Sequence, residues 1–331
     1  MKLSALSLVP VREGFTRKQA IDSVIREAKL AEELGFERFW IAEHHNIRAY
    51  ASSATQILVS TLLHHTQRIK VGAGGVMLPN HSPLIVAEQY GTLATLFPSR
   101  VEIGVGRAKG ADPFTAAALR RQAISHTHYE QDVADLQTYF GKEQPNGINA
   151  YPGVGTNIPI FVLGSSPASA YFAAEKGLPY AFASHFLPMQ QKQAAEIYRQ
   201  NFKPSEHYAK PYMVLCLNVN VAETDAEAHY TNSTLKQLFL NEQRGENVFV
   251  KPPVENMDSL YYSAGERHSI DLQSGGIFIG SKDSVTKQYA DFMDEYAELV
   301  DEIMLTGYIF DEEKWLDSLR KFTEIVKSYQ R

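Results

Sequence analysis

The stretch Phe39-Trp40-Ile41-Ala42-Glu43-His44-His45 begins as an apolar run and ends in three polar, titratable side chains. Aromatic and β-branched residues in succession are typical of a strand that is covered on both faces. In parallel α/β proteins, catalytic and binding groups gather where such strands end. The stretch therefore predicts a buried parallel strand with a functional site at its C-terminal end.

The two adjacent histidines are expected to play different parts in that site. Successive residues of an extended chain point to opposite faces, so His44 and His45 cannot both enter one pocket. We expect His44 to face the site, with His45 or Glu43 supporting it and fixing its tautomer. The alternative is a loop pair of histidines that only makes local hydrogen bonds.

Eight short apolar runs recur along the chain, and a segment with helical spacing follows each of them. Eight such units in 331 residues predict an α/β fold, a TIM (β/α)8 barrel with insertions. A doubly wound open sheet is the alternative, but it usually has fewer strands and a glycine-rich first turn. One helical region is longer, from about Pro113 to Phe140, with a break near Ser125. The apolar runs are Leu3–Val9, the opening stretch, Ile69–Ala73, Val101–Val105, Ile158–Leu163, Tyr180–Ala183, Tyr212–Val221 and Glu302–Leu305.

One segment, Gly245–Gly276, breaks this alternation because it is polar and irregular. A stretch of this length inside a barrel tends to be functional or disordered. Tyr261 and Tyr262 offer apolar bodies with polar tips, and nearby glycines can absorb backbone rotation, which suits a lid. The alternative is a surface insertion without a role. We expect one barrel domain over residues 1–331, with an irregular insertion at about 245–276.

The composition is that of a soluble globular protein, with 44% hydrophobic residues and a formal net charge of −6. The chain has no basic stretch to neutralise phosphates, so we expect no nucleic-acid partner. No apolar run approaches the roughly 20 residues of a membrane span, and the N-terminus does not resemble a signal peptide. These features, together with the single Cys216, predict a cytoplasmic protein that does not associate with membranes.

The sequence Gly104-Val-Gly106-Arg107-Ala-Lys-Gly110 is close to a dinucleotide-binding fingerprint. However, its third glycine falls one residue late, and it follows the fourth strand rather than the first. We therefore expect no nicotinamide site there. Arg107 still offers a permanently charged, forked donor at a strand end, which suits a phosphate. The alternative is an ion pair of Arg107 with Asp112.

Two further strand ends carry small residues. Gly164-Ser165-Ser166-Pro167-Ala168-Ser169 opens a helix, where backbone amides, the helix dipole and hydroxyls favour an anion. The alternative is ordinary capping by Ser166 ahead of Pro167. Gly74-Gly75 allows unusual backbone geometry or the close approach of a flat ligand, and a plain bulge is the alternative.

Taken together, the motifs resemble those of the bacterial luciferase-like flavin-dependent monooxygenases, in the same order and spacing over nearly the whole chain. The resemblance is strongest to single-chain members that are similar to the alkanal monooxygenase subunits. The matching segments are Ala42–His45, Val71–Pro79, Gly104–Arg107, Ser165–Ser169, Ala173–Pro179, Gly280–Val285 and Val300–Leu305.

The resemblance implies a TIM barrel that binds FMN at its C-terminal mouth. It implies phosphate contacts from Arg107, Ser166 and Ser169, with Ser165 of the same turn also in the cofactor site. It places a cis peptide between Gly74 and Gly75 against the flavin ring, and His44 beside the reactive face of the flavin. Gly106 stands where the luminescent α subunit has a cysteine, and Ser165 where it has an acidic residue, so light emission is not expected.

The resemblance also implies the reaction and its partners. Reduced FMN, supplied by a separate flavin reductase, would react with oxygen and oxidise a small organic substrate, with an aldehyde as one candidate. The catalytic residues would be His44, as general base or hydrogen-bond donor near pKa ~6.5, with Glu43 and His45. We expect a homodimer and no metal. The alternatives are a deazaflavin-dependent hydride-transfer enzyme, a flavin-binding protein without catalysis, and a metal hydrolase that uses His44 and His45.

Overall fold

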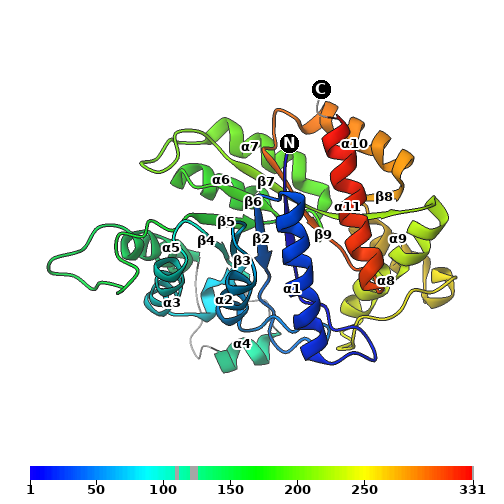
Figure 1. The fold of residues 1–331 in the computed structure, drawn as a ribbon, viewed down its shortest axis with the longest axis horizontal. Coiled ribbons are helices and arrows are strands. Elements are labelled where there is room, and N and C mark those ends of the chain that lie inside the picture. The colour runs from blue at the N-terminus through cyan, green and yellow to red at the C-terminus, as the bar shows by residue number, and fades with distance from the viewer. Residues whose placement is uncertain (109–111, 120–125, 330–331) are drawn as a thin grey trace.

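The chain folds into a closed parallel barrel, the TIM barrel that the sequence predicts (Figure 1). The computed structural model describes residues 1–108, 112–119 and 126–329. The eight barrel strands are β1 (Lys2–Ser7), β2 (Arg38–Ile41), β3 (Lys70–Met77), β4 (Val101–Gly106), β5 (Ile160–Gly164), β6 (Tyr180–Phe182), β7 (Met213–Ala222) and β9 (Glu302–Thr306). Strands β1 to β6 pair in chain order, β6 pairs with β7, β7 with β9, and β9 with β1, which closes the barrel.

Helices surround the barrel, and the first and last of the chain, α1 and α11, lie side by side (Figure 1). Arg26 Nη2 on α1 contacts Glu312 Oε2 on α11 at 2.6 Å, which joins the two ends of the helical ring. The helices are α1 (Arg17–Leu34), α2 (Thr55–His65), α3 (Pro83–Leu96), α4 (Pro113–Leu119), α5 (His126–Phe140), α6 (Pro167–Lys176), α7 (Gln191–Asn201), α8 (Asp225–Gln243), α9 (Ala264–Gln273), α10 (Lys282–Tyr296) and α11 (Glu312–Tyr329), with the 3-10 helices η1 (Leu78–Asn80), η2 (Pro188–Gln190) and η3 (Met257–Leu260).

Local sequence signals fix where these helices begin and end. Thr16 and Gln19 form a capping box at the start of α1, and Gly35, with φ of 84°, ends that helix in the left-handed conformation. Two positions named from the sequence, Gly110 and the break near Ser125, lie outside the described residues. Among those that are described, no helix is both long and apolar enough to cross a membrane.

Residues 245–276 are less irregular than the sequence predicts, because they contain η3 and α9. Ser263 caps α9 by accepting a hydrogen bond from the Glu266 amide at 3.1 Å. The helix has ten residues and only Ile270 is buried, so its periodicity is too weak to read from sequence. Met257, Leu260 and Tyr261 pack against the apolar cluster that includes barrel-interior residues, so the segment does not stand free on the surface.

A ninth strand, β8 (Ile277–Ser281), was not foreseen. Strand β7 has ten residues, and β6 pairs only with its first part, from Met213 to Leu215. The remainder of β7 extends beyond β6 and would leave backbone groups without partners, which costs free energy. Strand β8 pairs with this remainder, from Asn218 to Ala222, and so lies outside the eight-stranded closure.

A buried group of charges joins three strands at the N-terminal end of the barrel. Arg38 Nη1 lies 2.7 Å from Glu102 Oε2, and Arg38 Nε lies 2.9 Å from Glu302 Oε1. The guanidinium also stacks over the ring of Phe161, with 4.8 Å to the ring centroid. Because these residues belong to β2, β4 and β9, the group fixes the relative positions of those strands.

Candidate active site

A cleft of about 630 Å³ opens at the C-terminal ends of the barrel strands. This volume is in the usual range for a small-molecule site, and the C-terminal face is where TIM-barrel enzymes carry their chemistry. The structure brings six of the predicted site residues to the wall of this cleft. They are His44, Gly74, Arg107, Ser165, Ser166 and Ser169.

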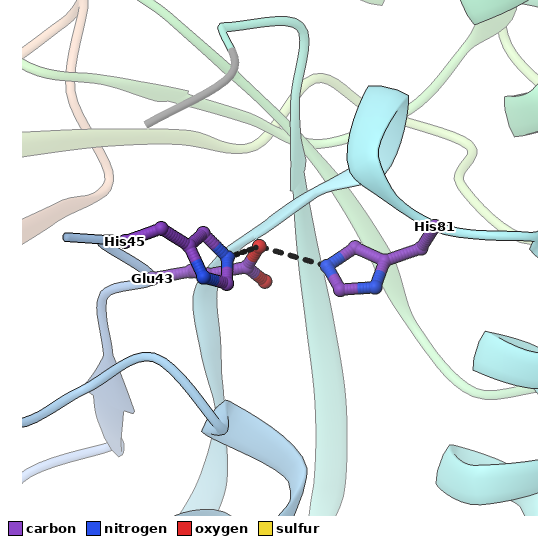
Figure 2. Close-up of side chains that lie close together, drawn as sticks. All are labelled: Glu43, His45 and His81. Carbon is purple, nitrogen blue, oxygen red and sulfur yellow. Dashed lines mark hydrogen bonds and ion pairs between the residues drawn. The ribbon is translucent and has the colours of Figure 1, made fainter. Parts of the chain in front are cut away.

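Glu43 and His45 lie outside the cleft wall and meet a third residue, His81, which the sequence analysis did not single out (Figure 2). Glu43 is fully buried, and its Oε1 lies 2.8 Å from His45 Nε2 and 2.7 Å from His81 Nε2. Its Oε2 accepts a hydrogen bond from the Met77 amide at 3.3 Å. Glu43 therefore joins the loop after β2 to the loop after β3; we call Glu43, His45 and His81 the Glu43 clamp.

The Glu43 clamp keeps its carboxylate ionised. Burial by itself would raise the pKa of Glu43, but the hydrogen bonds from His45 and His81 outweigh it and lower that pKa to about 2. An ionised carboxylate only accepts hydrogen bonds, so both Nε2 atoms carry a hydrogen. Glu43, His45 and His81 each offer one atom that could bind a metal ion, and these atoms lie within 4.8 Å of one another. His44 is not part of this group.

His44 lies on the cleft side, as the alternation of side chains predicts. Its ring centroid is 4.7 Å from that of Tyr50, and its Nδ1 is buried without a hydrogen-bond partner among the described residues. The expectation that Glu43 or His45 fixes its tautomer is therefore wrong for Nδ1. Burial lowers the pKa of His44 from 6.5 to about 4, with Glu43 opposing this shift and His45 adding to it. The imidazole is neutral at pH 7, and the expectation of a pKa near ~6.5 is also wrong.

His185 is a second cleft histidine that the sequence analysis missed. It follows β6 within three residues and is 4% exposed. Burial lowers its pKa to about 3, the Cys216 backbone opposes this, and His44 adds to the lowering. The signal that singled out His44, a titratable residue just beyond a strand end, is equally present at His185. His81 had a weaker signal, since it stands among the polar residues ahead of Pro83.

The serine turn at the start of α6 is not capped by a serine hydroxyl. Ser166 occupies the N-cap position, yet its side chain makes no capping hydrogen bond. The Ser169 hydroxyl lies 2.7 Å from the Ser166 carbonyl and 2.8 Å from the Tyr180 hydroxyl. Ser169 passes so close to Gly164 that a Cβ at that glycine would collide with it. Ser169 thus shapes the turn, and a phosphate contact from its hydroxyl would replace its bond to Ser166.

The peptide bond between Gly74 and Gly75 is cis, as the resemblance implies. The register between β3 and β4 also shifts between Gly74 and Val76, so the pair of glycines has the unusual backbone geometry that the sequence allows. A Cβ at Gly74 would lie 2.7 Å from the Trp40 ring, and one at Gly75 would lie 2.6 Å from the Gly104 carbonyl oxygen. Packing inside the barrel therefore excludes side chains at both positions, and Gly74 also lines the cleft.

The closed barrel and its mouth cleft are those of a TIM-barrel enzyme, and comparison with known proteins gives the family. Residues 1–299 match the luciferase-like monooxygenase family. The chain is 41% identical over 317 residues to a luciferase-like monooxygenase of Escherichia coli (strain K12), covering 95% of this chain and 94% of that one. The solved structure of apo-MsnO8 superposes with a TM-score of 0.86 at 30% identity, covering 100% and 99% of the two chains. The chain belongs to the luciferase-like monooxygenase family.

Two more distant solved structures carry different cofactors. The oxygenating constituent of 3,6-diketocamphane monooxygenase from Pseudomonas putida, in complex with FMN, has a TM-score of 0.72 at 16% identity, with 99% of each chain covered. A secondary alcohol dehydrogenase that depends on the deazaflavin coenzyme F420 has a TM-score of 0.68 at 14% identity, with 100% and 99% covered. At these identities the likeness shows the shared fold alone.

The neutral, buried state of His44 predicts an acid-dependent loss of stability. Its folded pKa of about 4 lies below the unfolded value near 6.5, so the unfolded chain binds more protons between these values. Its contribution to stability is therefore complete above pH ~6.5 and is lost as the pH falls toward 4. We expect His44→Gln to reduce the slope of unfolding free energy against pH in this window, by up to about 1.4 kcal/mol per pH unit.

Urea unfolding at a series of pH values from 7 to 4 measures this slope. The exposed His65 on α2 provides the matched control, and His65→Gln should leave the slope as it is in the native chain. Parallel curves for the native chain and His44→Gln would show that His44 does not lose its proton on folding.

Proposed function

We propose that the protein is a monooxygenase that uses reduced FMN and oxygen to oxidise a small organic substrate, with an aldehyde as one candidate. The observation that carries this proposal is the division of one cleft into two parts. Arg107 and the serine turn of α6 follow the neighbouring strands β4 and β5, and most of the other lining residues are apolar, with His44, His185 and Glu130 among them. FMN has the same division, with a phosphate at one end and a flat, mostly apolar ring system at the other.

The anion end supports a phosphate on physical grounds. The N-terminus of α6 presents backbone amides and the positive end of the helix dipole, and Ser166 has not committed its side chain to capping. Arg107, at the exposed edge of the same cleft, adds a permanent charge. The residues of this turn therefore fit the phosphate of FMN, which would be held by Arg107, Ser165 and Ser166.

The chemistry that reduced FMN supplies when bound is the reduction of oxygen that makes one oxygen atom available to a substrate. Near that chemistry, His44 offers a neutral imidazole that can accept or donate a hydrogen bond. The packing of Met257, Leu260 and Tyr261 on the interior cluster supports the exclusion of water. The glycine motif at Gly104–Gly110 has the wrong spacing for a nicotinamide nucleotide, which favours a separate flavin reductase as the source of reduced FMN.

Loss of Arg107 tests the orientation of the cofactor. Arg107→Ala should lower the affinity for FMN by about one to two decades. The affinity for riboflavin, which lacks the phosphate, should be nearly unchanged. Fluorescence titration with both ligands measures this, and Arg68→Ala, an exposed arginine in the turn between α2 and β3, is the control. Equal losses for FMN and riboflavin would contradict the assignment.

Oxygen uptake with reduced FMN, and the absorption spectrum of the purified protein, separate FMN from a deazaflavin.

The Glu43 clamp is predicted to act through His44. With residues 43 and 45 both held on the far side, His44 between them is directed into the cleft. His44→Ala should reduce turnover of the substrate by roughly 10²–10⁴-fold while FMN affinity is nearly kept. His81→Phe removes one donor to Glu43 and should also slow that reaction at nearly unchanged FMN affinity.

A double-mutant cycle decides whether His81 acts through His44. In the His44→Ala background, adding His81→Phe should cause little further loss, because the orientation of a missing side chain no longer matters. The exposed His65→Phe is the control for a histidine replaced on the surface. If the loss in the double variant equals the product of the losses in the two single variants, the two histidines act independently.

We also propose a homodimer that forms through α2 and α3. Three large apolar side chains are exposed on these helices, namely Ile57 (69%), Ile85 (49%) and Leu96 (62%). A stable interface there should bury at least about 1,600 Å² in total. Light scattering at micromolar concentrations should give twice the chain mass of 37.1 kDa, and Ile57→Lys should shift it toward one chain. A single-chain mass for the native protein at all concentrations would exclude the dimer.

A further inference from the structure

The backbone of His185 is held in place on both sides, while one of its two ring nitrogens, Nδ1, makes no hydrogen bond among the described residues. Its amide donates to the Cys216 carbonyl at 2.9 Å, and its carbonyl accepts from Asn218 Nδ2 at 3.0 Å, so β7 holds it on both sides. The residue lines the cleft and is 4% exposed. Its Nδ1 is buried, and within the described ranges it has no hydrogen-bond partner.

The same cleft contains a second ring of this kind. His44 also lines the cleft with a buried Nδ1 that lacks a partner in the described part of the chain, and a charge on His44 would lower the pKa of His185. Beside His185, Ser184 Oγ and Asn218 Oδ1 are likewise buried and unpaired among the described residues. Buried polar atoms in native proteins almost always have a partner, including water or a ligand. Of these atoms, only the two Nδ1 atoms belong to residues that line the cleft, and they indicate a place for a bound polar group.

The surroundings of the two rings are apolar. Leu6, Ala42, Leu163, Ala183 and Phe186 line the same cleft, and the rings of His185 and Phe186 lie 4.2 Å apart. A molecule that occupies this part of the cleft would bury mostly apolar surface, with one position for a hydrogen bond. We propose that His185 and His44 form a polar subsite that takes the single uncharged oxygen, a carbonyl or a hydroxyl, of an otherwise apolar substrate.

The charges around the subsite explain why that group is uncharged. Burial lowers the pKa of both histidines, to about 3 and about 4, so neither carries a charge at pH 7. Glu43 acts electrostatically on His44, but its carboxylate is already held by His45, His81 and the Met77 amide. The other charged side chains that line the cleft among the described residues, Arg107 and Glu130, are exposed. A carboxylate or ammonium group beside the two buried rings would therefore lose its hydration without an opposite charge buried with it. A neutral imidazole can donate or accept, so it suits either kind of oxygen.

This inference rests on the proposed function, since it names the class of substrate for the same cleft. The flavin and the substrate would share the cleft, with Arg107 and the serine turn of α6 serving the flavin. If His185 served the flavin instead, its replacement would change FMN affinity, so the experiment measures cofactor and probe binding separately.

The test compares four unbranched eight-carbon probes with different polar groups: 2-octanone, 1-octanol, octanoate and octylammonium. Calorimetric titration of the FMN-loaded native protein should give affinities for the two neutral probes that are at least about tenfold higher than for the two ions. His185→Phe keeps an aromatic ring that cannot form these hydrogen bonds. It should lower the affinity for the neutral probes by about tenfold. His185→Gln should retain most of the affinity because its amide can still form a hydrogen bond.

The exposed His207, on a different loop, gives the matched control, and His207→Phe should leave all four affinities unchanged. FMN affinity should be the same in every variant. Equal binding of octanoate and 1-octanol, unchanged binding of 2-octanone by His185→Phe, or a tenfold loss of FMN affinity in that variant would each overturn the subsite.

The same design separates this inference from the proposed function. If the native protein does not bind FMN, the proposed cofactor is wrong, and the four probes are then titrated into the FMN-free chain. Preference for the neutral probes there, with loss in His185→Phe, would support the subsite by itself. Should His185→Phe fail to fold, as judged by circular dichroism, His185→Leu replaces it in the same comparison.

Discussion

The structure depends on a buried arginine that holds two carboxylates at the closed end of the barrel. Burial disfavours the charge of Arg38, but Glu302 and Glu102 outweigh that cost and raise its pKa. Removing one partner of such a group leaves an uncompensated buried charge, which typically costs about 3–5 kcal/mol. The arrangement is therefore only stable when all three strands are in register, and it penalises any other closure of the barrel.

Strand β2 carries this constraint to the site. It has only four residues, and Arg38 is the first of them. Two residues beyond its last one, Glu43 is also fully buried, with His45, His81 and the Met77 amide as partners. One short strand thus has a buried positive charge fixed at one end and a buried negative charge fixed at the other. With both ends held, the rotation of the chain about His44 is determined, and its ring lies on the cleft side.

Patterns within single segments predicted most of the fold. The eight barrel strands and the helix ends at Gly35 and Gly177 follow from local apolar spacing and from glycine in the left-handed conformation. What the sequence did not show depends on distant partners. Strand β8 exists because β7 extends beyond β6, a fact that becomes visible only when the strands are paired. His81 matters because it meets Glu43 across 38 residues of chain, which no local pattern encodes.

The carboxylate of Glu43 points away from the cleft, and this affects the protonation of the cleft histidines. Glu43 is directly beside His44 in sequence, and an ionised carboxylate that faced the cleft would favour a protonated imidazole. The clamp instead satisfies that carboxylate on the far side, where His45 and His81 meet it (Figure 2). Burial then dominates at His44 and His185, and both rings remain neutral. Among the described residues, the charged side chains that line the cleft, Arg107 and Glu130, are exposed, and the two buried histidines are uncharged. The clamp that orients His44 therefore also determines which part of a ligand can lie beside it.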